Sequence, residues 1–274
     1  AVGRWGLFEA INVTALVERL FHEEETWLFE NTPGIVALQG PASLEPLAPA
    51  GLLVDGFDAW PAALLPYNPP YYPEMVEGEG YAQLRRWSAW TLACPSVRRP
   101  KPRTKEPIDW RRVGETAERV DDAEDHAPGL RRWLAHLAGR EAFPAHRQLR
   151  WALARPFGRA VVAQTEGSFC LGIPDFVPAL RLTGGRLFPG GYALYLLALA
   201  RTRRLRVFPA FTAENGGVAQ LRALYAQLVD KASERGYREL VIAPIYDEDE
   251  KSAEALLGLG ARATQRFAVC EKQM

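Results

Sequence analysis

Cysteine and histidine are scarce in this chain, and their positions exclude several kinds of site. Among 274 residues there are four histidines and only three cysteines, which are Cys94, Cys170 and Cys270. No Cys-x-x-Cys pair occurs, and no histidine lies near a cysteine at the spacing of a metal site. This pattern argues against zinc and against a disulfide framework. We therefore expect no bound metal, and scattered free thiols are typical of the reducing cytoplasm.

The chain also lacks an excess of either charge and lacks a long hydrophobic run. Its 33 basic and 33 acidic side chains give a net charge of zero, with an isoelectric point near 7.1. No overall field therefore attracts nucleic acid or an acidic membrane. The longest apolar stretch, residues 192–200, is far shorter than a membrane span. We expect a cytoplasmic protein without nucleic-acid or membrane partners.

Proline and aromatic residues are crowded into one stretch, residues 51–81, which is too rich in proline for a continuous helix or strand. We expect its polar and aromatic side chains to line a substrate pocket, through Asp55, Asp58, Trp60, Tyr67, Asn68 and Tyr71. Two other interpretations stay open. The aspartates on either side of Gly56 fit Asx turns about equally well. The aromatic rings could instead attach the loop to the core.

The C-terminal part of the chain has the most regular pattern. Hydrophobic periodicity predicts a strand at 205–211, a helix at 218–235, a strand at 239–243, a helix at 249–257 and a strand at 263–270. The same order recurs near the N-terminus, at 5–9, 16–30, 35–38, 70–79 and from 81 onward. The first copy differs by a long irregular segment at 39–67. We therefore predict an α/β protein built as a degenerate tandem repeat.

Residues 95–110 separate the two copies and are basic and rich in proline, which is typical of a solvated linker. We expect an N-terminal half at 1–94 and a C-terminal half at 111–274. In the second half, residues 160–163 and 169–173 predict a hairpin, and residues 174–192 predict a loop. The chain opens at Ala1 in what looks like the middle of a strand, so we expect that residues are missing from its start.

Several short motifs carry a resemblance to a known family. They are WGLFE (5–9), GP (40–41), GLLVDGFD (51–58), YNPPYY (67–72), IPD (173–175), GRLFP (185–189), GLGA (258–261) and EK (271–272). With them the chain resembles GCN5-related N-acetyltransferases (GNAT), and more narrowly bacterial double-GNAT-like proteins of unassigned activity. The resemblance covers nearly the whole chain and is weakest at 96–159. It implies the acyl-CoA N-acyltransferase fold with mixed central sheets, and a first copy that lacks its opening strands and helices.

The resemblance also implies an activity, which is acyl transfer from acetyl-CoA, or another acyl-CoA, to an amine. The acceptor would be a small-molecule or protein amine, and the family pattern allows a homodimer. In this fold the pyrophosphate of CoA meets backbone N–H groups where a loop enters the central helix. Gly217 and Ala219 fit the family's glycine spacing, whereas Glu214 replaces its basic or amide residue. The expected CoA-binding residues are Phe211, Thr212, Ala213, Glu214, Asn215, Gly216, Gly217, Val218 and Ala219.

For catalysis, the resemblance points to Glu9 as a general base and to Tyr72 as the acid that protonates the leaving thiolate. In the second copy the position of that tyrosine is Leu256, which cannot donate a proton. Other interpretations remain beside these. Glu9 fits an exposed strand-end residue, and the first copy fits a decayed duplicate kept for packing. The whole chain also fits a catalytically inactive GNAT-like protein that binds a ligand or a partner.

Overall fold

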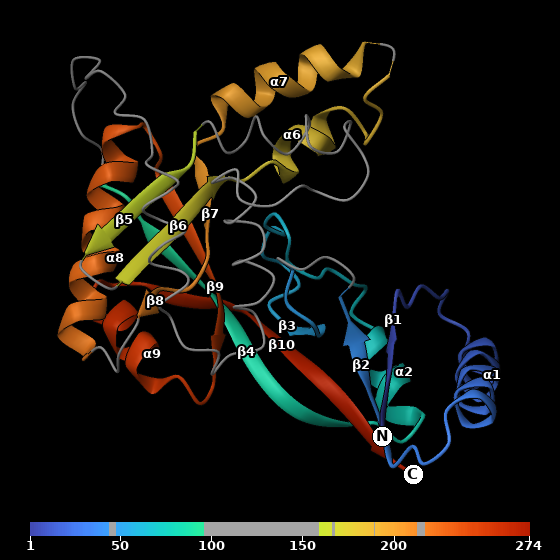
Figure 1. The fold of residues 1–274 in the computed structure, drawn as a ribbon. Helices are drawn as coiled ribbons and strands as arrows, with labels where there is room; N and C mark the ends of the chain where they lie inside the picture. The colour runs from blue at the N-terminus through green and yellow to red at the C-terminus, as the bar shows by residue number, and fades with distance from the viewer. Residues whose placement is uncertain (44–47, 96–158, 166–167, 189, 213–216) are drawn as a thin grey trace. The chain divides into compact units, whose positions relative to one another are not determined.

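The computed structural model describes residues 1–43, 48–95, 159–165, 168–188, 190–212 and 217–274. The chain forms two compact units (Figure 1). The first unit contains Ala1–Ser88 and Thr264–Met274, and the second contains Ala89–Ala263. Among the residues described, no helix has the length and apolar character needed to cross a membrane.

The first unit is built on a mixed sheet with two helices. Its elements are β1 (Val2–Gly6), α1 (Thr14–Asn31), β2 (Ala37–Ala42), β3 (Leu52–Asp55), α2 (Tyr72–Gly78), the start of β4 (Ala82–Ala93) and most of β10 (Arg262–Gln273). β1 pairs with β2 in parallel, and β10 pairs antiparallel with both β2 and β3. The mixed α/β class predicted from the sequence is therefore confirmed here.

Side chains along β1 alternate between buried and exposed positions, and the buried ones contribute to the core of the first unit. Gly3 and Trp5 are buried while the residues between them are exposed, as expected for a strand with one covered face. Val17 and Phe21, one helical turn apart on α1, are also buried, and the Phe21 ring packs edge-on against Trp5 with centroids 5.2 Å apart. A Cβ at Gly40 would lie 2.5 Å from the Trp5 indole, so only glycine fits there.

The second unit also combines parallel and antiparallel strands. Its elements are β5 (Val161–Thr165), β6 (Ser168–Pro174), α6 (Val177–Leu182), α7 (Gly191–Arg201), β7 (Arg204–Val207), β8 (Phe211–Thr212), α8 (Val218–Glu234), β9 (Glu239–Tyr246) and α9 (Glu250–Leu257). β6 pairs antiparallel with β5, β7 and β8, which confirms the predicted hairpin, and β7 pairs with β9 in parallel.

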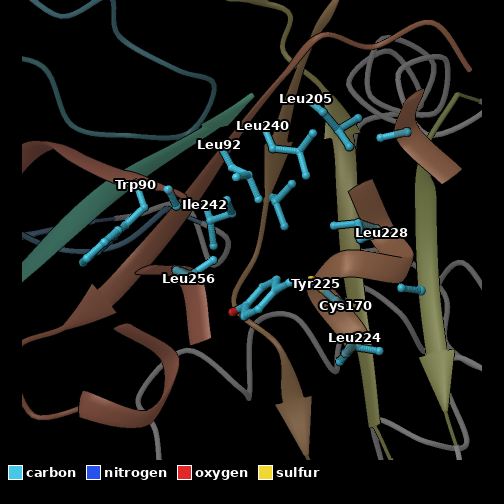
Figure 2. Close-up of a cluster of buried hydrophobic side chains, with 14 of the residues drawn as sticks. Trp90, Leu92, Cys170, Leu205, Leu224, Tyr225, Leu228, Leu240, Ile242 and Leu256 are labelled. Carbon is cyan, nitrogen blue, oxygen red and sulfur yellow. The ribbon is translucent and has the colours of Figure 1, made fainter. Parts of the chain in front are cut away.

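The core of the second unit lies between α8 and these strands (Figure 2). Leu221, Leu224 and Leu228 recur at helical spacing on α8 and are buried. They belong to one cluster with Leu205 of β7 and Ile242 of β9. The helix is therefore held by its apolar face, and its exposed face carries polar residues.

The predicted repeat is visible as two parallel strand–helix–strand units, β1–α1–β2 and β7–α8–β9. The closing strands do not stay with their own copies. In the first unit, β10 pairs with β2, and in the second unit β4 lies beside β9. Residues 96–158 lie outside the described residues, so the linker at 95–110 and the boundaries at 94 and 111 stay predictions.

Several predicted elements were wrong in detail. Residues 174–192, expected to be loop, contain α6 and the start of α7. Pro178 lies in the first turn of α6, where a missing N–H costs little. β7 ends at Val207 rather than at 211, and residues 39–67 contain part of β2 and all of β3. Glu9 lies beyond the end of β1 instead of within a strand.

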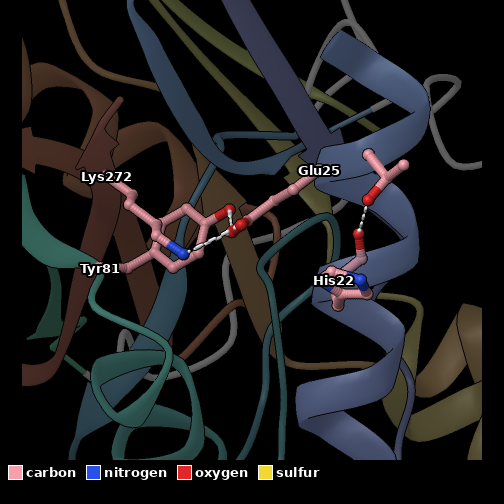
Figure 3. Close-up of polar contacts among 5 residues, drawn as sticks. His22, Glu25, Tyr81 and Lys272 are labelled. Carbon is pink, nitrogen blue, oxygen red and sulfur yellow. Dashed lines mark hydrogen bonds and ion pairs between the residues drawn. The ribbon is translucent and has the colours of Figure 1, made fainter. Parts of the chain in front are cut away.

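A half-buried ion pair joins the beginning and the end of the chain in the first unit (Figure 3). The Nζ of Lys272 lies 2.7 Å from Oε1 and 3.0 Å from Oε2 of Glu25. The Tyr81 hydroxyl donates to the same carboxylate at 3.3 Å. Glu24 lies beside this group, and burial, followed by the charge of Glu25, raises its pKa. One ammonium therefore offsets crowded carboxylates.

We expect Lys272→Met to reduce the free energy of unfolding by about 1–3 kcal/mol, because it leaves the Glu25 carboxylate partly buried and without its cation. Chemical denaturation followed by circular dichroism would measure the change. Lys251→Met, on the exposed side of α9, is the matched control and should change little. Equal effects of the two substitutions would contradict a stabilising role for the ion pair.

Candidate functional site

Two tyrosines of the first unit hold the segment that follows β1. The Tyr72 hydroxyl accepts a hydrogen bond from the Ala10 N–H at 2.9 Å, and the Tyr71 hydroxyl donates to the Ala10 carbonyl at 3.0 Å. Leu7 has a left-handed backbone with φ of 56°, a strained conformation for leucine, and it turns the chain at this point. The Phe8 ring then packs edge-on against Tyr72 with centroids 4.8 Å apart.

The two residues expected to act in catalysis, Glu9 and Tyr72, lie together. The Tyr72 hydroxyl donates to Oε2 of Glu9 at 3.0 Å. Burial raises the pKa of Tyr72, and the hydrogen bond to Glu9 acts in the same direction, so the phenol stays protonated at neutral pH. Glu9 is exposed, whereas the Tyr72 side chain is only 2% exposed. The arrangement presents a carboxylate at the surface, oriented by a phenol beneath it.

Of the residues expected to bind substrate, Asn68 lies deepest. Its Oδ1 accepts from the Leu53 N–H at 2.8 Å, and its Nδ2 donates to the carbonyls of Leu53 and Pro69 at 3.1 Å. The amide therefore acts as a partner for β3, in place of a neighbouring strand. Both of its donor hydrogens are used in this way, so the geometry favours a structural role for Asn68.

The other residues expected to bind substrate lie nearer the surface. Asp55 accepts from the N–H of Gly56 at 2.9 Å, and a Cβ at Gly56 would lie 2.2 Å from the Thr264 carbonyl oxygen. Asp58 is exposed, and Trp60 and Tyr67 are 55% and 58% exposed. The structure thus brings Tyr71 to Glu9 and Tyr72, and leaves Asp58, Trp60 and Tyr67 accessible to solvent.

In the second unit, the parallel strands β7 and β9 stop pairing before β9 ends. Their register runs from Arg204 and Glu239 to Val207 and Ile242, whereas β9 continues to Tyr246. Beyond Val207 the chain stays paired with β6, its other neighbour, and the Phe208 N–H donates to the Leu171 carbonyl at 2.9 Å. Pro209 and Pro244 each lie two residues past the last pair, and neither can donate a ladder hydrogen bond.

The N-terminus of α8 follows this point of separation. Gly217 is the N-cap residue, and no side chain caps the helix among the residues described. The first turn has no acidic residue, and a Cβ at Gly217 would have no heavy atom within 4 Å. N–H groups in such a first turn attract anions. Of the expected CoA-binding stretch, Ala213, Glu214, Asn215 and Gly216 lie outside the described residues, and Phe211 and Thr212 form β8.

A buried tyrosine that the sequence did not identify ties this region together. The Tyr225 hydroxyl of α8 accepts from the Ala210 N–H at 3.1 Å and is also hydrogen-bonded to the Ser252 side chain of α9. Burial raises the pKa of this phenol. In the sequence, Tyr225 stands out only as a hydroxyl-bearing residue on the otherwise aliphatic face of α8. Leu256, at the position of the family's acidic tyrosine, is fully buried in the core.

Buried charges beside β7 were also missed. Asp175 is fully buried, and its Oδ2 lies 3.4 Å from the Nε of Arg204. Arg206 is fully buried as well, and burial lowers its pKa to about 9, although the charge of Asp175 opposes this change. The sequence could have indicated these charges, because β7 carries arginines at alternate positions of an otherwise apolar strand. Alternate side chains of a strand point to the same face, so one face of β7 is charged.

Within the part of the chain that the structure describes, the cysteines are unreactive thiols and no metal-binding group is formed. Burial raises the pKa of Cys94 and of Cys270 to about 11, so both thiols are protonated at neutral pH. Within the described residues, no group of three or more His, Cys, Asp or Glu side chains is placed to hold a metal ion.

We expect Tyr72→Phe to lower the free energy of unfolding by about 1–2 kcal/mol, because the partly buried Ala10 N–H and the Glu9 carboxylate lose their partner. Denaturant titration gives the value. Tyr67→Phe removes the same hydroxyl from an exposed ring and should cost almost nothing. If both variants were as stable as the wild type, the phenol would not hold the segment after β1.

Comparison with known proteins gives partial matches. No protein-family model matches the chain. Protein YghO of Escherichia coli (strain K12) is 24% identical over 296 residues, covering 99% of this chain and 74% of that protein. Bacterial ceramide synthase of Caulobacter vibrioides (strain NA1000 / CB15N) is 36% identical over 81 residues, which cover 30% of this chain and 21% of the relative.

Two solved structures also align with the chain. A GCN5-related N-acetyltransferase from Sphaerobacter thermophilus has a TM-score of 0.46 at 15% identity, and covers 96% of this chain and 69% of that chain. A tandem GNAT protein from the clavulanic acid biosynthesis pathway has a TM-score of 0.39 at 10% identity, and covers 94% of this chain and 69% of that chain.

Proposed function

We propose that this protein is an acyl-CoA-dependent N-acyltransferase that uses acetyl-CoA or another acyl-CoA. The observation that carries the proposal is the separation of β7 from β9 just before the uncapped N-terminus of α8. Parallel strands that diverge leave room for an extended ligand beside them. The N-terminus of α8, which follows β7 and β8 along the chain, supplies donors for a pyrophosphate. Together these two features suit an elongated, phosphate-bearing cosubstrate.

In this proposal the diphosphate of CoA meets the N–H groups of Gly217, Val218 and Ala219, and the pantetheine lies along the segment that begins at Phe211. The amine then attacks the thioester carbonyl directly, the C–N bond forms, and CoA leaves as a thiolate that takes up a proton. The amine must lose a proton to a base. Within the first unit, the group that suits a base is the exposed carboxylate of Glu9, which accepts a hydrogen bond from Tyr72.

The acceptor is proposed to be an amine. Ceramides are amides of long-chain amino alcohols, so the local similarity to a bacterial ceramide synthase supports transfer to nitrogen. Asp55 and Asp58 are both exposed and would attract a protonated amine to the first unit. The three cysteines are free and buried, which supports a cytoplasmic location.

A second candidate function is ligand binding without catalysis, and one observation favours it. The backbone donors of residues 208–210, which could polarise a thioester carbonyl, are already used. The Phe208 N–H donates to Leu171, the Ala210 N–H donates to Tyr225, and Pro209 has none. Leu256 cannot protonate a leaving thiolate. An enzyme with this geometry must polarise the carbonyl with other groups.

We expect acetyl-CoA to release or absorb measurable heat on titration into the full-length protein, and Gly217→Glu to weaken its binding about tenfold or more. The added carboxylate would lie against the phosphates at the helix N-terminus. Gly190→Glu is the matched control, since Gly190 is the N-cap of α7 and also has open space at its Cβ. Isothermal titration calorimetry measures all three affinities.

The absence of binding by the wild type at high ligand concentration would overturn the cofactor assignment. Binding without thiol release across a panel of amines would instead establish the second candidate. If the Glu9→Gln variant released thiol as fast as the wild type, Glu9 would not be the base.

A further inference from the structure

A helical hairpin of the second unit, residues 176–203, exposes large apolar side chains. It consists of α6 and α7, which connect β6 to β7 along the chain and pack against each other (Figure 1). The exposed fractions are 90% for Phe188, 61% for Leu182, 50% for Leu197 and 43% for Leu194. The inner face of the hairpin has its own small core of Ala179, Tyr195 and Leu199, so these exposed side chains are not needed to hold the two helices together.

The exposed face of α7 differs from that of an ordinary surface helix. From Gly191 to Ala200 this helix has no charged or amide side chain. Its solvent-facing residues are Ala193, Leu194, Leu197 and Ala200. By contrast, the exposed face of α8 carries Arg222, Asp230 and Glu234. A helix that is apolar on all sides is normally covered on all sides.

The charged side chains of the hairpin segment itself have a single sign. Residues 176–213 contain six arginines and no aspartate, glutamate or lysine. Four of these arginines, Arg181, Arg186, Arg201 and Arg203, are exposed on or beside the hairpin. Arg159 adds a further guanidinium at the C-terminal end of α7, where it donates to the carbonyls of Leu199 and Ala200. The net charge of zero over the whole chain therefore conceals one strongly basic segment.

We propose that the hairpin docks on a lipid bilayer that carries anionic headgroups. Phe188, Leu194 and Leu197 enter the boundary between headgroups and acyl chains, while the arginines contact lipid phosphates. α7 has 11 residues, which is too short to span the hydrocarbon, so the contact is interfacial. This inference does not depend on acyl transfer or on CoA binding.

The charge pattern favours a bilayer over a second copy of the chain. In a two-fold contact the same patch meets itself, so the arginines of one copy would face those of the other. Such a contact brings like charges together, whereas an anionic membrane offers the opposite charge. Single-sign charge beside exposed leucine and phenylalanine is the pattern of a peripheral membrane surface.

We expect the full-length protein to sediment with vesicles of phosphatidylcholine and phosphatidylglycerol in equal parts, and to bind weakly to phosphatidylcholine alone. Added salt should weaken the binding. The double variant Leu194→Gln/Leu197→Gln should lower the partition coefficient about tenfold or more, because two apolar side chains no longer enter the interface. Arg186→Gln/Arg201→Gln should lower it about tenfold on the anionic vesicles only.

The matched controls are Leu84→Gln/Leu257→Gln and Arg262→Gln/Arg266→Gln, whose side chains are exposed elsewhere on the chain, and both should bind as the wild type does. Failure of the wild type to bind anionic vesicles overturns the proposal, as does equal binding by the Leu194→Gln/Leu197→Gln variant. Sedimentation velocity supplies a further check. A wild-type dimer that this variant converts to a monomer would assign the surface to a second copy and overturn the membrane proposal.

Discussion

The organisation of the second unit depends on where the β7–β9 ladder ends. A proline follows two residues after the last paired residue on each strand, at Pro209 and Pro244. Neither proline has an N–H that could extend this ladder, whereas the segment after Val207 keeps its hydrogen bonds to β6 on the other side. The end of the ladder therefore places β8, and through it the start of α8. The proposed cosubstrate site exists only because these two strands separate.

In both units the segment after the first parallel strand is held by the same kind of hydrogen bond. In each, a tyrosine hydroxyl accepts a hydrogen bond from the N–H of an alanine, with Tyr72 bound to Ala10 and Tyr225 bound to Ala210. In the first unit a carboxylate, Glu9, also meets the phenol, and in the second unit a serine does. A shared backbone plan thus carries different polar chemistry in the two copies. This difference supports distinct roles for them in the proposed reaction.

A neutral overall charge does not describe the surface of this protein. In the first unit Glu25 of α1 pairs with Lys272, whereas residues 176–213 of the second unit carry only positive charge. Because screening limits each field to about 10 Å, local composition matters more than the sum. A basic, apolar hairpin on a lipid surface would hold the protein at the membrane.

The sequence by itself determined the elements whose signal is local. The apolar spacing of α8, the alternation in β1 and the order of strands and helices in both copies follow from side chains a few residues apart. It did not determine the exchange of β4 and β10, the use of Asn68 as a partner for β3, or the contact of Tyr225 with Ala210. Each of these joins groups that are distant in the chain, and a residue's type does not specify which distant partner it will meet. Only the folded chain, in which every buried donor needs an acceptor, decided those pairings.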